Sequence, residues 1–405
     1  ELRGKPAKAL RTYERLADDA TINHVKIAKL HLQNEQYAEA EHHAQEAIHL
    51  NPKDTLAYDL LAQAQEKQGK YAEAEQALRT AIDISEEHQD VFLNNLGLLF
   101  YHQQWYNQAI SYYKQAIELR DDFALYFDNL GLAHERSGQA EEAKAAYLKT
   151  VQLEPDNPLY TNRLGTILYR EGDFAGAKLH YEKTVALKPD DPVGHDNLGL
   201  ALEALQDFEG AERAYQQALE VSEAAERDIY YNRLGVFCYR QGRHVEAIGY
   251  YRHAIEYREQ AVYYENLGLA YEMLEKWEEA GAAYHKAVDI AEADDMAGHQ
   301  NRLGVYYYKI GESQLAIEHY QRAIQHDAEP AVYYENLALA FEAIGDSKNA
   351  LQAYRQALER SPSEPLYTNK LGLLYLAQED YESAEGYFKK TIALKPDDPI
   401  GYENL

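Results

Sequence analysis

The stretch YTNRLGTILYREGDFAGAKLHYEKTVALKPDDP, residues 160–192, decides the fold, because related copies of it fill this chain of 405 residues. A small residue after Leu or Ile recurs eleven times, mostly in steps of 34 residues. We call it position 0 of each repeat: Ala28, Ala62, Gly97, Gly131, Gly165, Gly199, Gly235, Gly268, Gly304, Ala338 and Gly372. Alanine follows each of them after twelve residues, and an aromatic ring follows nine of them after sixteen, with Ala44 and Leu78 as the exceptions. A short fixed period indicates a repeat protein rather than several globular domains.

Each copy contains two apolar stripes with helical spacing. In residues 160–192 they are Leu164, Ile167 and Leu168, and then Phe174, Ala177, Tyr181 and Val185. Between the stripes lies a turn at Gly172, where glycine can adopt a positive φ. The same turn holds glycine in other copies, at Gly69, Gly138, Gly242, Gly311 and Gly345. Proline residues end one copy and begin the next, so the unit is two helices joined by a turn.

With Leu-Gly, then Ala, then Tyr at a period of 34, the sequence resembles the tetratricopeptide repeat (TPR) family over its whole length. The resemblance implies an all-α fold, a right-handed superhelical α-solenoid of TPR helix-turn-helix repeats. Each repeat then buries its apolar face against its neighbours. The Ala and Gly columns are expected to be framework positions where helices cross closely.

We expect a single TPR array over residues 1–405. Residues 1–20 have the spacing of the second helix of a preceding repeat, residues 21–398 form eleven repeats, and residues 399–405 begin a twelfth. Both ends fall inside a repeat, so the chain is expected to be a piece of a longer protein. From Val91 onward the copies alternate in pairs, and longer junctions at 221–228 and 290–296 predict local irregularity of the superhelix.

The composition is acidic, with 40 Lys and Arg against 68 Asp and Glu and a net charge of -28. Such a charge repels phosphate backbones and anionic lipid, so we expect no nucleic-acid binding. The apolar runs are too short to cross a bilayer, and no targeting segment opens the chain. We therefore expect a soluble, cytoplasmic protein without membrane insertion.

Motifs for chemistry are missing from the sequence. Cys238 is the only cysteine and lies in an apolar stretch, so it is expected to be a buried packing residue. We find no phosphate loop, nucleophile elbow or metal-ligand spacing among the 16 His residues. We expect no enzyme activity, no cofactor and no metal.

By the resemblance, the first helix of each repeat lines the concave groove, and there an asparagine column stands out. Counted from position 0, it occupies position −2 at Asn95, Asn129, Asn197, Asn266 and Asn336, and position −3 at Asn94, Asn162, Asn232, Asn301 and Asn369. Asparagine inside a helix costs roughly 0.5 kcal/mol relative to alanine. The amides either grip successive peptide groups of an extended ligand, or bond to neighbouring helices.

Charge alternates along the same helices. Asn-Arg/Lys before Leu-Gly, with Arg163, Arg233, Arg302 and Lys370, alternates with Asp/Glu-Asn in the intervening copies. Further along these helices the same alternation recurs, with basic His102, Arg170, Arg240 and Lys309 against acidic Glu135, Glu203, Glu272 and Glu342. One explanation is ion pairs between adjacent repeats, each worth about 0.5 kcal/mol if exposed. The other is a groove that reads ligand charge, in which the arginines take carboxylates in a bidentate manner. Tyr residues at positions expected to face the groove are further candidate peptide contacts: Tyr169, Tyr239 and Tyr308.

These features predict a protein-protein interaction scaffold that binds an extended peptide or partner segment in the concave groove of a TPR superhelix. An alternative is the recognition or sensor arm of a larger enzyme or signalling ATPase. A third is an architectural spacer or self-assembling scaffold. The expected partner is a protein or peptide, and other domains of the same chain could serve.

Overall fold

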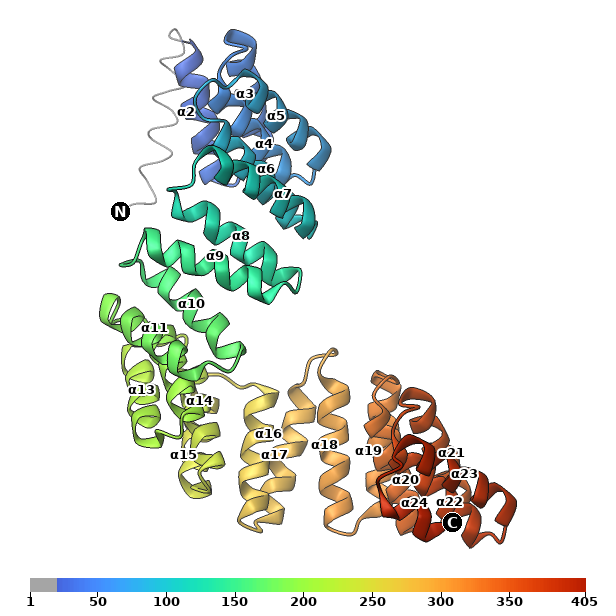
Figure 1. The fold of residues 1–405 in the computed structure, drawn as a ribbon. Helices are drawn as coiled ribbons and strands as arrows, with labels where there is room; N and C mark the ends of the chain where they lie inside the picture. Colours follow the sequence, from blue (N-terminus) through green and yellow to red (C-terminus); the bar gives the residue numbers. More distant parts are fainter. Residues whose placement is uncertain (1–19) are drawn as a thin grey trace. The chain divides into compact units, whose positions relative to one another are not determined.

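The computed structural model describes residues 20–405, and every regular element in this range is an α-helix (Figure 1). The first helices of the repeats are α2 (Ala20–Gln33), α4 (Thr55–Lys67), α6 (Gln89–His102), α8 (Ala124–Arg136), α10 (Pro158–Arg170), α12 (Pro192–Ala204), α14 (Arg227–Arg240), α16 (Ala261–Met273), α18 (Met296–Lys309), α20 (Ala331–Ala343), α22 (Pro365–Ala377) and α24 (Pro399–Asn404). The second helices are α3 (Tyr37–Leu50), α5 (Tyr71–Ile84), α7 (Tyr106–Leu119), α9 (Ala140–Leu153), α11 (Phe174–Leu187), α13 (Phe208–Val221), α15 (His244–Tyr257), α17 (Trp277–Ile290), α19 (Ser313–His326), α21 (Ser347–Arg360) and α23 (Tyr381–Leu394). The helix expected within residues 1–20 lies outside the described residues.

The chain divides into two compact units, the first ending at Ala214 and the second running from Tyr215 to Leu405. Within each unit a helix contacts mainly the helices next to it in the sequence, as expected for a repeat array. The predicted all-α solenoid of helical hairpins is confirmed, and the handedness of its superhelix stays a prediction.

The glycines at position 0 are explained by the aromatic ring sixteen residues later. A Cβ atom added to Gly165 would lie 2.7 Å from Cε1 of Tyr181, and the corresponding ring lies as close to the glycines at position 0 of other repeats. Where the ring is replaced by Ala44 or Leu78, position 0 holds an alanine. The glycine therefore makes room for a ring inside its own repeat, rather than for a close crossing of helix axes as we expected. Ala338 beside Tyr354 departs from this rule.

The turns between the two helices match the sequence prediction. Gly172 has φ +85°, and the other predicted turn glycines have similar positive values. In the remaining copies Glu or Gln takes the same left-handed conformation, with φ between 56° and 64°: Glu35, Gln104, Gln206, Glu275 and Glu379. These five are positions where a non-glycine residue accepts a costly backbone conformation.

Candidate protein-interaction groove

The two sets of asparagines are donor and acceptor of one bond. The Nδ2 atom of Asn197, at position −2, donates to Oδ1 of Asn162, at position −3 of the preceding repeat, over 2.9 Å. Four more pairs make the same bond at 2.8–2.9 Å: Asn129 to Asn94, Asn266 to Asn232, Asn336 to Asn301 and Asn404 to Asn369. The asparagine column is thus a set of bonds between neighbouring repeats.

Arginine and a carboxylate take over the same two positions between the asparagine pairs. Arg163, at position −2, is hydrogen-bonded to Asp128, at position −3 of the repeat before it. Nε of Arg302 donates to Oε1 of Glu265 over 3.2 Å in the same arrangement. Arg233 holds position −2 of α14 and is half-buried. We call this series of inter-repeat bonds the ladder, and each bond a rung.

Lys370 is the exception among the basic residues. Its Nζ atom lies 3.1 Å from Oε2 of Glu342, which holds position +4 of the preceding repeat. The carboxylate at position −3 there, Glu335, instead accepts a hydrogen bond from the Tyr367 hydroxyl. An ammonium group is a point charge on a flexible stem and has no preferred two-pronged geometry, so lysine pairs here with a carboxylate about two helical turns away from the usual acceptor.

Sequence reasoning missed Asp59 as a member of the ladder. Nδ2 of Asn95 donates to Oδ1 of Asp59 over 2.8 Å, so the ladder extends into a repeat that lacks the asparagine signature. Burial raises the pKa of the Asp59 carboxyl, although Asn95 and Gln63 donate hydrogen bonds to it. Its place three residues before Ala62 was the signal that could have identified it.

A rung leaves most of the polar capacity of an asparagine pair unused. It takes one N–H group and one oxygen lone pair, and the two amides together hold four N–H groups and two oxygens. Asn94 and Asn129 are only 3% and 7% exposed, so their remaining groups face the protein interior. The other predicted asparagines are half-buried, which keeps them within reach of a ligand.

A second set of ion pairs runs beside the ladder. Glu135 accepts from the Tyr147 hydroxyl over 2.9 Å and is paired with Arg170 of the next repeat. Glu272 is paired with Lys309 in the same way, at 2.6 Å. The inter-repeat ion pairs proposed from the sequence are therefore present. That the first helices line a groove and that this groove reads ligand charge both stay predictions.

Two of the three predicted tyrosines pack against a neighbouring ring, and all three remain partly accessible. Ring centroids are 5.2 Å apart for Tyr169 and Phe174, and also 5.2 Å apart for Tyr239 and His244. Tyr308 is 36% exposed. The first two rings are thus held against the second helix of their own repeat, and the third has a part of its surface facing solvent.

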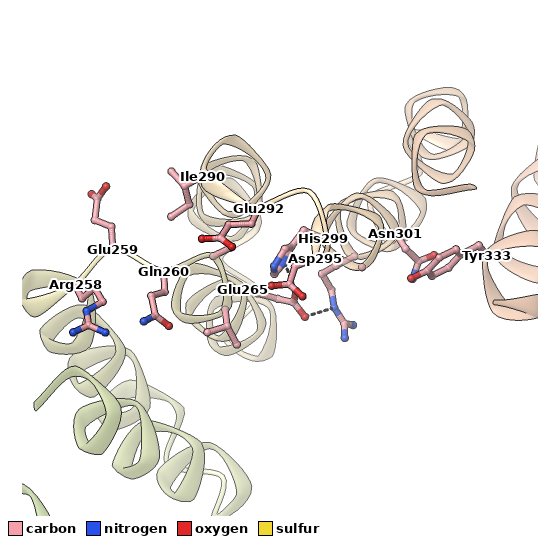
Figure 2. Close-up of a pocket in the computed structure, with 14 residues that line it drawn as sticks. Arg258, Glu259, Gln260, Glu265, Ile290, Glu292, Asp295, His299, Asn301 and Tyr333 are labelled. Carbon is pink, nitrogen blue, oxygen red and sulfur yellow. Dashed lines mark hydrogen bonds and ion pairs between the residues drawn. The ribbon is translucent and has the colours of Figure 1, made fainter. Parts of the chain in front are cut away.

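A cavity of about 870 Å³ in the second unit brings ladder residues together with residues that we did not predict (Figure 2). Glu265, Asn301 and Arg302 line it, together with His299 and Tyr333. Loops of unusual length form its rim, because 258–260 has three residues and 291–295 has five, whereas the other loops between repeats mostly have four. The expected irregularity at 290–296 therefore coincides with this cavity.

Glu265 is a carboxylate of the cavity that contacts two other lining residues, His299 and Arg302. Burial by itself would raise the pKa of this carboxyl, but a hydrogen bond from His299 at 2.7 Å and the Arg302 guanidinium outweigh burial and lower it. Glu265 is therefore a carboxylate that already has two partners.

A second cavity, of about 530 Å³, lies in the first unit. Asp59, Asn95 and Leu98 line it, so the ladder borders this hollow as well. Over residues 20–405 we find no helix that could cross a membrane and no cluster of His, Cys, Asp or Glu that could hold a metal ion. Cys238 is fully buried, as expected.

Stacked helical hairpins with inter-repeat bonds along their first helices define a helical-repeat protein. Comparison with family profiles gives the same class: profiles described as tetratricopeptide repeat match residues 25–88, 129–192, 197–261, 301–365 and 335–399, and also 91–123 and 259–329. The chain belongs to the tetratricopeptide repeat family. No curated protein sequence is a significant match to it.

Two of the solved structures that show some similarity to this chain are the following. The crystal structure of the APC/C hetero-tetramer Cut9–Hcn1 aligns with 100% of this chain and 93% of its own, at 16% identity and a TM-score of 0.43. A structure of pilF from Pseudomonas aeruginosa aligns with 50% of this chain and 92% of its own, at 20% identity and a TM-score of 0.44. Both scores are low, so the fold rests on the family profiles and the helices themselves.

Proposed function

We propose that this chain holds an extended segment of a partner protein against the ladder on its first helices. The observation that carries this proposal is the row of half-buried asparagine pairs at positions −2 and −3, each with N–H and C=O groups left over after the rung has formed. An extended peptide offers matching groups along its backbone, whatever its side chains.

Affinity and selectivity would come from different columns. Amide bonds to a peptide backbone are available to any sequence, so the asparagines supply affinity with little preference. Selectivity would come from Tyr169, Tyr239 and Tyr308, and from Arg163, Arg233 and Arg302. Arg163 and Arg302 already pair with carboxylates of the ladder, so replacing them uncovers those carboxylates and should weaken acidic ligands preferentially.

The test removes whole rungs, so that no amide is left without its partner. The variant is Asn232→Ala, Asn266→Ala, Asn301→Ala and Asn336→Ala, which deletes two rungs of the second unit. Each lost rung costs about 1 kcal/mol of stability. The two Asn-to-Ala changes in each rung regain about 1 kcal/mol through helix propensity, so the variant should remain folded.

Peptides selected from a random phage-displayed library on the wild-type protein serve as ligands. Their binding to the four-fold variant should weaken by about 1 kcal/mol per lost ligand bond. The matched control replaces four exposed glutamines on second helices by alanine: Gln217, Gln314, Gln321 and Gln352. If the control loses the peptides and the ladder variant keeps them, the second helices are the binding surface and the proposal is wrong.

A further inference from the structure

A column of exposed aliphatic side chains lies one helical turn before the ladder. It occupies position −6, four residues before position −2, so both positions share one face of the first helix. In the second unit these side chains are between 41% and 48% exposed: Ile229, Val262, Val332, Leu366 and Ile400. The first unit repeats the column with Leu56, Val91, Leu125, Leu159 and Val193, all exposed. Single exposed aliphatics are ordinary on a protein surface, but one in the same place of nearly every repeat is a recurring feature of each unit.

The loops just before this column are acidic. Exposed carboxylates stand three residues before the aliphatic side chain at Glu226, Glu259 and Glu329, and Asp397 precedes Ile400 by the same interval. Some acidic residues of these loops have a structural task, since Glu364 and Asp398 cap their helices. Glu226 and Asp295 are also the N-cap residues of their helices, but their side chains make no capping hydrogen bond. The capping requirement therefore does not account for all of the negative charge.

Gly298 interrupts the column. It holds position −6 of α18, it is exposed, and a Cβ atom added there would meet nothing within 4 Å. Gly298 itself lines the 870 Å³ cavity, together with the apolar residues Val262 and Ile290. The carboxylates Glu292 and Asp295 line the same cavity (Figure 2).

The two arginines of the cavity do not make it an anion site. Arg302 is paired with Glu265, and Arg258 lies 3.6 Å from Asp228 and donates to the carbonyl oxygen of Ala225. Glu292 and Asp295 have no such cation beside them among the ion pairs of residues 20–405. The surplus charge in the cavity is negative, as it is for the whole chain.

We propose that this surface, the loop edge, docks a partner-protein segment in which basic and aliphatic residues alternate. The loop edge consists of the position −6 side chains Val262 and Val332, the carboxylates Glu259, Glu292 and Asp295, and the Gly298 cavity. One Lys or Arg side chain of the partner enters the cavity, its stem against Val262 and Ile290 and its cation at Glu292 and Asp295. The aliphatic neighbours of that side chain cover Val262 and Val332. This inference goes beyond the ladder proposal and does not rest on it.

The experiment uses three fluorescein-labelled dodecapeptides with the repeats Lys-Leu-Gly, Lys-Ser-Gly and Glu-Leu-Gly. Fluorescence anisotropy at physiological salt should show binding of the Lys-Leu-Gly peptide, about tenfold weaker binding of Lys-Ser-Gly, and the weakest binding of Glu-Leu-Gly. Equal binding of the first two would overturn the proposal, since it would show only diffuse attraction by net charge. Preference for Glu-Leu-Gly, or no binding of Lys-Leu-Gly, would overturn it too.

Two variants locate the binding on the loop edge. Gly298→Leu fills the cavity, and Val262→Ser with Glu292→Gln and Asp295→Asn removes its apolar and acidic walls. Each should weaken Lys-Leu-Gly binding about tenfold. The matched control is Val245→Ser with Glu278→Gln and Glu279→Gln, which changes exposed residues of the same kinds on second helices and should leave binding unchanged.

Gly298→Leu should not destabilise the fold, because the position is open and leucine is a better helix former than glycine. A loss of binding in this variant therefore cannot be attributed to misfolding. Equal affinity of the edge variants and the control would place the peptide elsewhere and overturn the proposal. The double variant Asn232→Ala with Asn266→Ala deletes one rung whose residues do not line the cavity, and it should keep the Lys-Leu-Gly peptide. If it keeps this peptide together with the phage-selected ones, the ladder proposal fails while the loop edge stands.

Discussion

Asn197 donates to Asn162 across the junction of two repeats over 2.9 Å, and this bond explains why the sequence repeats in pairs. From α6 onward, a first helix typically gives a donor at position −2 to the repeat before it and an acceptor at position −3 to the repeat after it, with Lys370 and Glu335 as the exception. An asparagine pair or an arginine with a carboxylate can form the rung, but a rung joins two repeats. Replacing an asparagine rung by an arginine rung therefore changes residues in two neighbouring repeats. Because the two kinds of rung alternate along the chain, the smallest unit that can be copied unchanged is a pair of repeats.

The first prediction is energetic coupling across this rung. Asn162→Ala and Asn197→Ala each remove the bond and leave the other amide unpaired, at a cost of about 1 kcal/mol before the gain in helix propensity. The double variant should cost hardly more than either single one, which gives a coupling energy of about 1 kcal/mol. Urea unfolding of the four proteins measures it. Additive effects would mean that the bond contributes nothing to stability.

The framework could be predicted from the sequence because its contacts lie inside one repeat. Gly165 faces Tyr181, and the same pair of positions recurs along the chain. The glycine and the ring therefore occur together in repeat after repeat, which makes both columns visible in the sequence. The turns follow from Gly172 and its counterparts for the same reason. What the sequence could not reveal is which neighbour requires the glycine, since a ring and a crossing helix both exclude a side chain.

The candidate site was predicted less completely, because it depends on contacts between repeats. The asparagine columns were visible, but not that positions −2 and −3 bond to each other, and Asp59 was missed because it is not an asparagine. The cavity at Gly298 is lined in part by residues of the loops 258–260 and 291–295, whose lengths of three and five residues depart from the usual four. Spacing indicated an irregularity there but could not show a hollow.

The second prediction concerns the glycine at position 0. Gly165→Ala places a methyl group 2.7 Å from the Tyr181 ring, so the ring must move, at a cost of roughly 1–3 kcal/mol. The penalty should shrink in a Tyr181→Leu background, as Leu78 beside Ala62 suggests. Gly249→Ala in α15 is the control, since its surroundings are open and it should stabilise by roughly 0.5–1 kcal/mol. An equal penalty in both backgrounds would show that the ring is not the obstacle.

The third prediction concerns the turns. Gly172 has φ +85°, so Gly172→Ala should destabilise by about 1 kcal/mol although nothing lies near its Cβ position. The reverse change, Gln104→Gly, relieves a left-handed residue at the equivalent turn, where φ is 64°. It should cost much less than a glycine placed in a helix interior. Thermal unfolding of the two variants measures both, and a neutral Gly172→Ala would contradict a left-handed turn.

The fourth prediction is a loss of stability in acid that runs through His319. This ring is 7% exposed, and its Nδ1 atom lies 2.8 Å from Oε1 of Gln300. Burial, then the positive charge of Arg322 and the neighbouring His285, lower its pKa from 6.5 to about 4. The folded protein therefore keeps the ring neutral where the unfolded chain already binds a proton. The contribution is fully present above pH 6.5 and is lost as the pH falls toward about 4.

His319→Gln tests this assignment because glutamine cannot titrate. Other buried groups also respond to acid, and His43 in the first unit has its pKa lowered to about 4, first by burial and then by the adjacent His24, His31 and His42. The useful quantity is therefore the difference in unfolding free energy between wild type and His319→Gln, followed by urea titration at a series of pH values. This difference should narrow between pH 6.5 and about 4, because only the wild type loses the contribution of the neutral ring. If the two curves stay parallel over that range, His319 binds its proton as readily in the folded protein as in the unfolded chain.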